Sequence, residues 1–294
     1  MVSGRTYLTG LIGTGIGPSL SPALHENEGT ALGLRYLYRR IDIGDAGLTA
    51  ADTPGLIGSA RLLGFDGLNI THPCKQAALS GVSALSPEAE ALGAVNTVVF
   101  GDGGAIGHNT DWSGFGRSLR RGLPGAALDH VAVLGAGGAG AAVSYALARL
   151  GAARLTLLDA DESRAAALAA SLAPRFGGQH VGHAPLAELT PVLDRADGLV
   201  HATPTGMAGH PGMAVPADAL RPELWVADVV YRPLETELVR AARKAGCPTL
   251  DGGPMAVFQA AEAFRLFTGV EPDAARMLAD FERLTSTEQE DHDD

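Results

Sequence analysis

The feature that most restricts how this chain can fold is a glycine-spaced turn between a strand-like run and a helical run. Residues 130–134 are mostly apolar and favour a buried β-strand, and residues 141–150 are rich in Ala and Leu, as in a helix. Between them, three glycines follow the spacing G-x-G-x-x-G. Such a turn lets the backbone approach a pyrophosphate, whose charge the helix N-terminus stabilises. The sequence therefore predicts a dinucleotide-binding βαβ unit rather than a purely structural turn. The expected cofactor-binding residues of the turn are Gly135, Gly137, Gly138, Ala139 and Gly140.

A second apolar strand, residues 155–158, ends in Asp159, about 20 residues after the last glycine of the turn. A carboxylate at this place accepts hydrogen bonds from the adenosine ribose hydroxyls and repels a 2′-phosphate. The pattern therefore predicts NAD rather than NADP as the cofactor. An alternative stays open, in which Asp159 only caps the helix that begins near residues 159–164, since Asp and Ser are good N-caps.

The composition is that of a globular α/β protein. With 294 residues, the chain is long enough for one large or two ordinary domains, and 46% hydrophobic residues can fill a complete core. The formal net charge is −11, and five of the acidic residues stand in residues 285–294, which we expect to be a disordered tail. This acidity argues against a nucleic-acid partner, so local donors must hold any anionic ligand.

Cysteine use and hydropathy predict a soluble, cytoplasmic protein. Cys74 and Cys247 are far apart in the sequence and suggest no disulfide framework, which fits a reducing compartment. The N-terminus lacks the apolar stretch of a signal peptide, and no apolar run approaches the roughly 20 residues of a membrane span. The histidines form no metal-binding pattern with cysteines or with each other, so we expect no metal site.

The order of the expected elements predicts two α/β domains, each with a parallel sheet, around a cleft. Strands and helices are expected to alternate over residues 1–112, with a hairpin around the glycine-rich residues 101–104. The nucleotide-binding domain then covers residues 113–254, with later strands near residues 198–202 and 225–229. Helices over residues 255–284 should return to the first domain, which is therefore discontinuous.

The first domain gathers polar residues at the ends of its expected strands. Each has a structural explanation, because Ser21, Thr71 and Asp111 could all cap helices. Lys75 is different, since it should lie on the first turn of a helix beginning at Pro73, where a helix N-terminus repels a cation. That position hints at function. The polar residues concerned are Ser19, Ser21, Asn69, Thr71, Lys75, Asn96, His108, Asn109 and Asp111.

Several short motifs resemble one enzyme family, in order and spacing. Residues 67–75 are similar to the G-x-N-V-T-x-P-x-K motif of the shikimate and quinate dehydrogenases, and residues 19–25 to their S-x-S-P-x-x-H segment. The resemblance extends from about residue 8 to residue 284 and is therefore highly specific. The other matching segments are residues 93–97, 107–111, 114–115, 202–207, 228–233, 251–252, 255 and 259–260.

The resemblance implies roles for particular residues. Ser19 and Ser21 would hold the substrate carboxylate, whereas Lys75 and Asp111 would form the catalytic pair. The resemblance also implies a hydroxy-acid substrate, a monomer or homodimer, and a place in the shikimate pathway or in quinate degradation. Further substrate-binding residues would be Thr71, Asn96, Tyr231 and Gln259, and further cofactor-binding residues Asp159, Arg164, Thr203 and Met207.

The expected chemistry suits these residue types. Oxidation of a secondary alcohol needs a hydride acceptor, which a nicotinamide supplies, and a group that takes the hydroxyl proton. Lys75 can act as a free-amine base or as a cation that polarises the carbonyl, and the sequence leaves both roles open. We therefore expect reversible oxidation of shikimate, quinate or both to the 3-dehydro ketone.

Departures from the family pattern bear on the cofactor. Relatives that use NADP carry Asn-Arg-Thr after the second nucleotide strand, whereas this chain has Asp159, Ala160 and Asp161, with Arg164 further on. His201 replaces an Asn of the family pattern. Rival interpretations are an NADP-dependent biosynthetic shikimate dehydrogenase, an enzyme for an amino-substituted analogue, and a non-catalytic ligand sensor.

Overall fold

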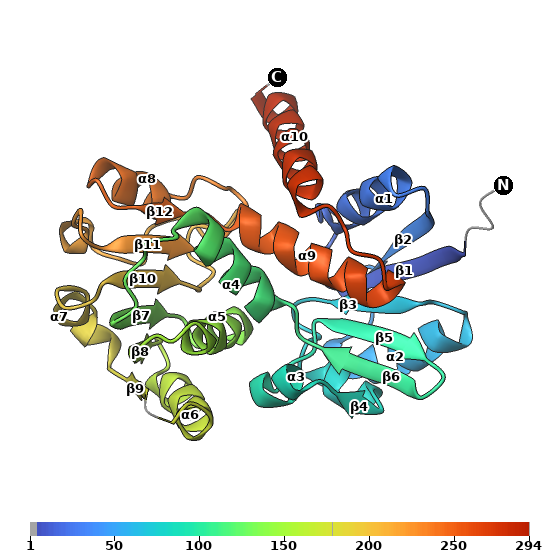
Figure 1. Ribbon diagram of the computed structural model, residues 1–294, viewed down its shortest axis with the longest axis horizontal. Helices are drawn as coiled ribbons and strands as arrows, with labels where there is room; N and C mark the ends of the chain where they lie inside the picture. The colour runs from blue at the N-terminus through green and yellow to red at the C-terminus, as the bar shows by residue number, and fades with distance from the viewer. Residues whose placement is uncertain (1–4, 178, 294) are drawn as a thin grey trace. The chain divides into compact units, whose positions relative to one another are not determined.

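The computed structural model describes residues 5–177 and 179–293, of which residues 287–293 are described by their backbone only. Its contacts divide the chain into two compact units (Figure 1). The first unit is Met1–Thr110 with Val257–Asp294, and the second unit is Asp111–Ala256. The two boundaries between the units lie two residues from those expected from the sequence, whereas the first unit also includes residues 285–294, which were expected to be a separate tail.

The first unit is built on a six-stranded sheet in the order β2-β1-β3-β5-β6-β4. Strand β1 is parallel to β2 and β3, whereas β5 is antiparallel to both β3 and β6. The sheet is therefore mixed rather than wholly parallel, because the hairpin expected around residues 101–104 reverses the chain within it. The strands are β1 (Thr6–Gly13), β2 (Arg35–Asp42), β3 (Gly67–Ile70), β4 (Ala84–Leu85), β5 (Thr97–Gly101) and β6 (Gly104–His108).

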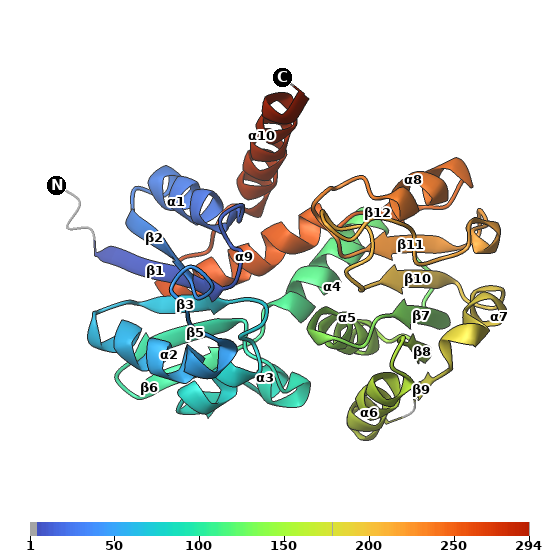
Figure 2. The same ribbon diagram turned by 180° about the vertical axis from the view of Figure 1, so that it is seen from behind.

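Helices cover both faces of this sheet. Helix α2 lies on one face, and α9 lies on the other (Figures 1 and 2). The side chains of β3 alternate between the two faces of the sheet: Leu68 and Ile70 pack with Ile57 of α2, and Asn69 points to the opposite face. On the α9 side, Tyr36 stacks on Phe264. The helices are α1 (Ser21–Ala31), α2 (Thr53–Leu62), α3 (Pro87–Leu92), α9 (Gly253–Thr268) and α10 (Ala274–Asp293).

The segment after β3 is a turn, and not the α-helix that the sequence predicts from Pro73. The Cys74 amide donates to the Thr71 carbonyl, and only a short 3-10 helix, η2 (Ala77–Gly81), follows. The Lys75 carbonyl accepts a hydrogen bond from the Val95 amide at 2.9 Å, and the Leu79 amide, which an α-helix would pair with Lys75, donates to the Gln76 carbonyl instead. Lys75 therefore does not face a helix dipole, and the helix-dipole hint of its function was wrong.

The C-terminal segment continues as helix α10 through Asp293, where the sequence predicts a disordered tail from residue 285. The hydroxyls of Thr285 and Ser286 donate to carbonyls of the preceding turn, and Arg283 pairs with Asp280. These local bonds, together with the good helix propensity of Glu and Gln, extend the helix beyond Leu284. Residue 294 lies outside the described residues.

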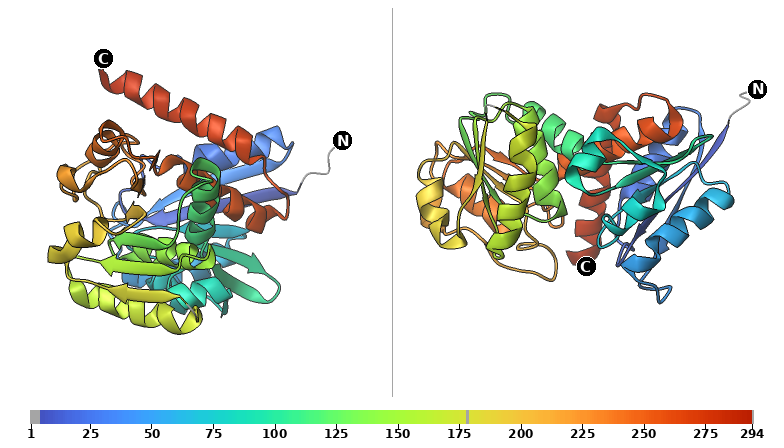
Figure 3. Two further views of the ribbon diagram at one scale, coloured as in Figure 1. Left: turned by 60° about the vertical axis from the view of Figure 1, so that its left-hand side comes forward. Right: turned by 90° about the horizontal axis from the view of Figure 1, so that it is seen from below.

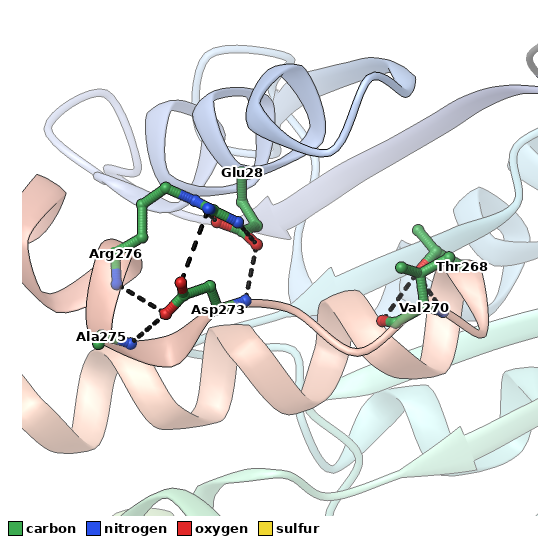
Figure 4. A network of polar contacts seen from close by, with 6 residues as sticks. All are labelled: Glu28, Thr268, Val270, Asp273, Ala275 and Arg276. Carbon is green, nitrogen blue, oxygen red and sulfur yellow. Dashed lines mark hydrogen bonds and ion pairs between the residues drawn. The ribbon is translucent and has the colours of Figure 1, made fainter. Parts of the chain in front are cut away.

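A buried carboxylate holds α10 to α1 within the first unit. Glu28 is fully buried, and both of its oxygens accept hydrogen bonds from the Arg276 guanidinium at 2.8 and 2.7 Å (Figure 4). One of these oxygens also accepts the Asp273 amide at 2.8 Å, and Asp273 in turn caps the first turn of α10. A bidentate, charge-assisted contact of this kind fixes both the position and the direction of the helix.

The second unit has a six-stranded, wholly parallel sheet in the order β12-β11-β10-β7-β8-β9. The order reverses beside β7, as in doubly wound nucleotide-binding folds. Helices α5 and α6 lie on one face of the sheet and α7 on the other (Figure 3), as right-handed crossovers require. The strands are β7 (His130–Leu134), β8 (Arg154–Leu158), β9 (His180–His183), β10 (Gly198–His201), β11 (Trp225–Asp228) and β12 (Thr249–Leu250).

Five α-helices connect these strands or precede them, and among the described residues no helix is long and apolar enough to cross a membrane. Their bounds are α4 (Asp111–Gly122), α5 (Gly138–Arg149), α6 (Glu162–Leu172), α7 (Leu189–Leu193) and α8 (Glu237–Lys244).

Candidate active site

The glycine turn after β7 has the geometry that a dinucleotide needs. Gly135 has a φ of +107°, which permits the tight turn and which other residues rarely adopt. A Cβ on Gly140 would stand 1.8 Å from the Gly135 carbonyl oxygen, so only glycine lets α5 pack this closely on the turn. Gly137 and Gly138 are different, because no backbone atom would obstruct a Cβ at either position. The space beside them is therefore open to a ligand, and the turn fits a pyrophosphate.

Asp159 is tied to this turn by both of its carboxylate oxygens. One accepts the Ala136 amide at 2.7 Å, and the other accepts the Asp161 amide at 2.9 Å. The N-cap of α6 is Asp161, whose side chain accepts the Ser163 amide, so Asp159 is not a helix cap. The Ser163 hydroxyl and amide also lower the pKa of Asp161. Each Asp159 oxygen keeps a lone pair, which is where a ribose hydroxyl could donate.

Arg164 approaches the same turn from the first helical turn of α6. A terminal nitrogen of its guanidinium would lie 3.3 Å from a Cβ placed on Gly137. The turn is therefore bordered by two acidic residues, Asp159 and Asp161, and by one cation. Their opposite charges favour different dinucleotides, since carboxylates repel a 2′-phosphate and a guanidinium attracts one.

Thr203 borders the turn from the end of β10. Its Cγ2 would lie 3.1 Å from a Cβ placed on Gly135, and its hydroxyl lies 2.5 Å from Nε2 of His201. Met207 is further along the same loop, where it lines an open cavity of about 420 Å³ together with Thr236 and Arg240. Tyr231 follows β11 and is 38% exposed. The structure thus brings Thr203 to the glycine turn, whereas Met207 and Tyr231 lie on the loops after β10 and β11.

In the first unit, a continuous chain of hydrogen bonds leads from Tyr38 to Asn96, one of the expected substrate residues. The Tyr38 hydroxyl donates to Asn69 at 2.8 Å. Asn69 donates to the Thr97 hydroxyl at 3.1 Å, and that hydroxyl donates to Asn96 at 3.0 Å. Tyr38, Asn69, Thr97 and Asn96 therefore form one buried polar network, and burial raises the pKa of Tyr38.

Asn96 is also held by Thr110. Its carbonyl oxygen accepts the Thr110 amide at 2.7 Å, and its amide group donates to the Thr110 hydroxyl at 3.0 Å. Asp111, the next residue along the chain, begins α4 and is 8% exposed. Both predicted catalytic residues therefore adjoin the Asn96 network, because the Lys75 carbonyl accepts the amide of Val95.

The remaining expected substrate residues are half-buried side chains of the first unit. Ser19 accepts the Ser21 amide at 3.3 Å, and the Arg40 guanidinium donates to the Ser19 carbonyl at 2.9 Å. Thr71 follows β3, and Gln259 lies on α9. The predicted roles of these residues stay predictions.

His25 has a structural position. It is fully buried among the rings of Tyr36, Tyr38, Phe264 and Phe267, and its Nδ1 lies 3.0 Å from the Tyr36 hydroxyl. Burial lowers its pKa to about 3, so the ring is neutral at physiological pH. No group of His, Cys, Asp or Glu within the described ranges is arranged to hold a metal ion.

Sequence reasoning missed the residues that connect the network. Tyr38 gave only an alternating strand pattern, and Thr97 and Thr110 stood inside longer motifs without a role of their own. Asp42 was also missed. Its carboxylate accepts the amides of Ile16 and Gly44, which fixes the loop before Ser19 and lowers the pKa of Asp42. Only the strand-end position of Asp42 could have indicated this.

Comparison with known proteins identifies the family. Residues 11–98 match the shikimate dehydrogenase substrate binding domain, and residues 254–279 match the shikimate 5′-dehydrogenase C-terminal domain. The chain is 62% identical over 282 residues to a shikimate dehydrogenase (NADP(+)) of Streptomyces avermitilis, which covers 96% of this chain and 97% of that relative. The chain belongs to the shikimate dehydrogenase family.

Two further comparisons involve Corynebacterium glutamicum. A quinate/shikimate dehydrogenase (NAD(+)) of strain R is 50% identical over 277 residues, or 94% of this chain and 98% of the relative. The solved structure of quinate dehydrogenase in complex with NAD has a TM-score of 0.89 and 49% identity, and the match covers 95% of this chain and 99% of that one. The family therefore includes similar relatives named for either cofactor, and the fold is the two-domain Rossmann-type fold of these dehydrogenases.

Proposed function

We propose that this member of the shikimate dehydrogenase family oxidises shikimate and quinate reversibly to the 3-dehydro ketone, with NAD as the preferred cofactor. The observation that carries the proposal is the position of the two acids at the glycine turn. Asp159 contacts the turn through the Ala136 amide, and Asp161 is held two residues further on. A 2′-phosphate beside these carboxylates would be repelled, whereas free ribose hydroxyls would donate to Asp159.

The substrate would be held by the polar residues of the first unit. Ser19 and Ser21 stand at the start of α1, where hydroxyls and backbone amides can receive a carboxylate. Thr71, Asn96 and Gln259 would bind the ring hydroxyls. The network from Tyr38 through Asn69 and Thr97 supports the assignment of Asn96, because a side chain that is already fixed need not be ordered when the substrate binds.

Lys75 and Asp111 would move the proton. Lys75 takes the proton of the reacting hydroxyl during oxidation and returns it during reduction, and Asp111 orients the hydroxyl and the ammonium. A bound nicotinamide supplies the hydride acceptor. The backbone around Lys75 supports a positioning function, since the Lys75 carbonyl is anchored to Val95 and the Thr71 carbonyl to the Cys74 amide.

A second candidate is a shikimate dehydrogenase that prefers NADP. Its support is the guanidinium of Arg164, which borders Gly137 and could pair with a 2′-phosphate. The Streptomyces avermitilis relative, which is named for NADP(+), gives the same direction. A non-catalytic sensor is less well supported, because Lys75 and Asp111 are both present.

One set of initial rates tests both candidates: shikimate and quinate, each with NAD and with NADP. We expect kcat/KM with NAD to exceed that with NADP at least about tenfold, or about 1.4 kcal/mol. Similar or higher efficiency with NADP would favour the second candidate, and no turnover in any combination would refute dehydrogenase function.

The same rates report substrate choice. Quinate has an additional C1 hydroxyl next to its carboxylate, and Ser21 is small enough to tolerate it. We expect turnover of both substrates with shikimate preferred, because a site without a dedicated partner discriminates weakly. Ser21→Thr should change the shikimate-to-quinate ratio of kcat/KM. An unchanged ratio would mean that the discrimination lies elsewhere.

A further inference from the structure

In the second unit, a buried row of hydrogen-bonded side chains leads from Thr203 to Thr236. Nε2 of His201 lies 2.5 Å from the Thr203 hydroxyl, and Nδ1 lies 2.9 Å from Oδ1 of Asp228. The other carboxylate oxygen accepts the Thr236 hydroxyl at 2.7 Å, and Thr236 also caps α8. The side chain of His201 is 1% exposed and that of Asp228 is fully buried, so water does not compete for these contacts.

The hydrogen positions along this chain follow from the donors around Asp228. Oδ1 of Asp228 also accepts the Val230 amide at 3.0 Å, so the carboxylate acts as acceptor on every side. Nδ1 of His201 must therefore carry the hydrogen of the His201–Asp228 contact. In a neutral ring Nε2 can then only accept, so the Thr203 hydroxyl donates its proton to His201.

This arrangement determines what Thr203 offers to a ligand. A hydroxyl has one hydrogen and two lone pairs. The hydrogen is used by His201, and one lone pair faces the Thr205 amide at 3.3 Å. The second lone pair remains, on a side chain whose Cγ2 lies against Gly135 of the glycine turn. Thr203 is thus fixed as an acceptor beside the expected cofactor.

We propose that His201, held by Asp228, is a positioning residue for cofactor binding: it directs the Thr203 hydroxyl so that it accepts a hydrogen bond from a hydroxyl or amide of the bound dinucleotide. The proposal rests on the proposed function in one respect, since it requires a dinucleotide at the glycine turn. It gives a role to the histidine that replaces an Asn of the family pattern.

Dissociation constants of NADH and NADPH, measured by fluorescence without turnover, test the proposal. Thr203→Val should weaken binding of the preferred dinucleotide about five- to tenfold, and Thr203→Ser should stay within about twofold of the native protein. The matched control is Thr156→Val, which removes a comparable hydrogen bond, from the Thr156 hydroxyl to Nε2 of His130 at 2.9 Å on strands β7 and β8. It should leave dinucleotide binding unchanged.

A mutant cycle separates positioning from a structural role. His201→Asn should weaken binding in the native background and have no further effect in the Thr203→Val background. Equal losses in both backgrounds, or native binding by Thr203→Val, would overturn the inference. If His201→Asn does not fold, the ¹⁵N chemical shift of His201 Nε2 decides instead. This shift must change when the dinucleotide binds to the native protein, and it must stay unchanged when the dinucleotide binds to Thr203→Val. Failure of the native protein to bind either dinucleotide would instead refute the proposed function.

Discussion

Gly137 offers a test that separates cofactor binding from folding. Its backbone angles, φ −77° and ψ −167°, suit any residue, and a Cβ would meet only the flexible end of Arg164 at 3.3 Å. Replacement of glycine by alanine in a permitted conformation stabilises a protein by about 0.4–1 kcal/mol. The loss of glycine at the N-cap of α5 costs a similar amount. Gly137→Ala should therefore change the free energy of unfolding by less than about 0.5 kcal/mol.

The same methyl group would occupy the space through which a pyrophosphate approaches the turn. Overpacking of a fitted site costs about 1–3 kcal/mol, which corresponds to about five- to 150-fold weaker binding. The measurement is the dissociation constant of NADH, together with urea unfolding of the same variant. Gly140→Ala is the contrasting variant, because its Cβ would stand 1.8 Å from a carbonyl oxygen and must destabilise the fold.

Two results would refute this reasoning. Native NADH affinity in Gly137→Ala would mean that no ligand approaches the backbone at this residue. A loss of more than about 1.5 kcal/mol of folding stability would mean that the protein itself, and not a ligand, requires glycine there.

Three further perturbations test other parts of the molecule. Lys75→Ala should lower kcat by about two to four orders of magnitude with little change in NADH affinity, while Lys244→Ala, an exposed control, should be neutral; a near-native kcat would contradict the proton-transfer role. Arg276→Gln leaves the buried Glu28 carboxylate without its ion pair and should lower the local free energy of unfolding by about 2–4 kcal/mol, measured by hydrogen exchange over residues 21–31. Arg283→Gln, on the exposed side of α10, should lower it by less than about 1 kcal/mol. Equal effects of the two variants would contradict the importance of the buried pair. His25 binds a proton near pH 6.5 in the unfolded chain but only near pH 3 in the folded protein, so the free energy of unfolding should fall by about 2 kcal/mol from about pH 6.5 to about pH 4.5. His25→Phe should remove this pH dependence. An identical pH dependence in the variant would mean that His25 is not the group responsible.

The sequence predicted the elements whose signals are local. The glycine spacing, the apolar strands and the 101–104 hairpin depend on residues that are close along the chain, and the structure has all three. The helix expected from Pro73 was wrong, because the Lys75 carbonyl bonds to Val95, 20 residues away. Contacts at that separation leave no periodic pattern.

The candidate site shows the same division. Motif residues such as Asn69 and Asn96 could be selected from the sequence, but the Tyr38 and Thr97 side chains that bond to them could not. Their connection depends on the order of β2, β1, β3 and β5 in the sheet. His201 was visible only as a departure from a pattern, and its contact with Asp228 requires the pairing of β10 with β11.

Overall sequence similarity does not decide which cofactor this chain prefers, because that preference depends on only a few charged residues beside the glycine turn. A charge-assisted hydrogen bond to a phosphate is worth about 1.5–3 kcal/mol, so one residue can change the preference about tenfold to 100-fold.

The structure also shows which residue to change. Asp159→Asn would remove an acceptor from either Ala136 or Asp161 and loosen the turn, so a loss of NAD affinity there would be ambiguous. Ala160→Arg leaves both hydrogen bonds in place and adds the arginine that NADP-using relatives carry at this position. We expect Ala160→Arg to raise kcat/KM with NADP at least about tenfold while kcat/KM with NAD changes little. The opposite result would be an unchanged kcat/KM with NADP in Ala160→Arg together with a lowered kcat/KM with NADP in Arg164→Gln. That result would assign the 2′-phosphate contact to Arg164 and contradict the proposed role of residues 159–161 in cofactor choice.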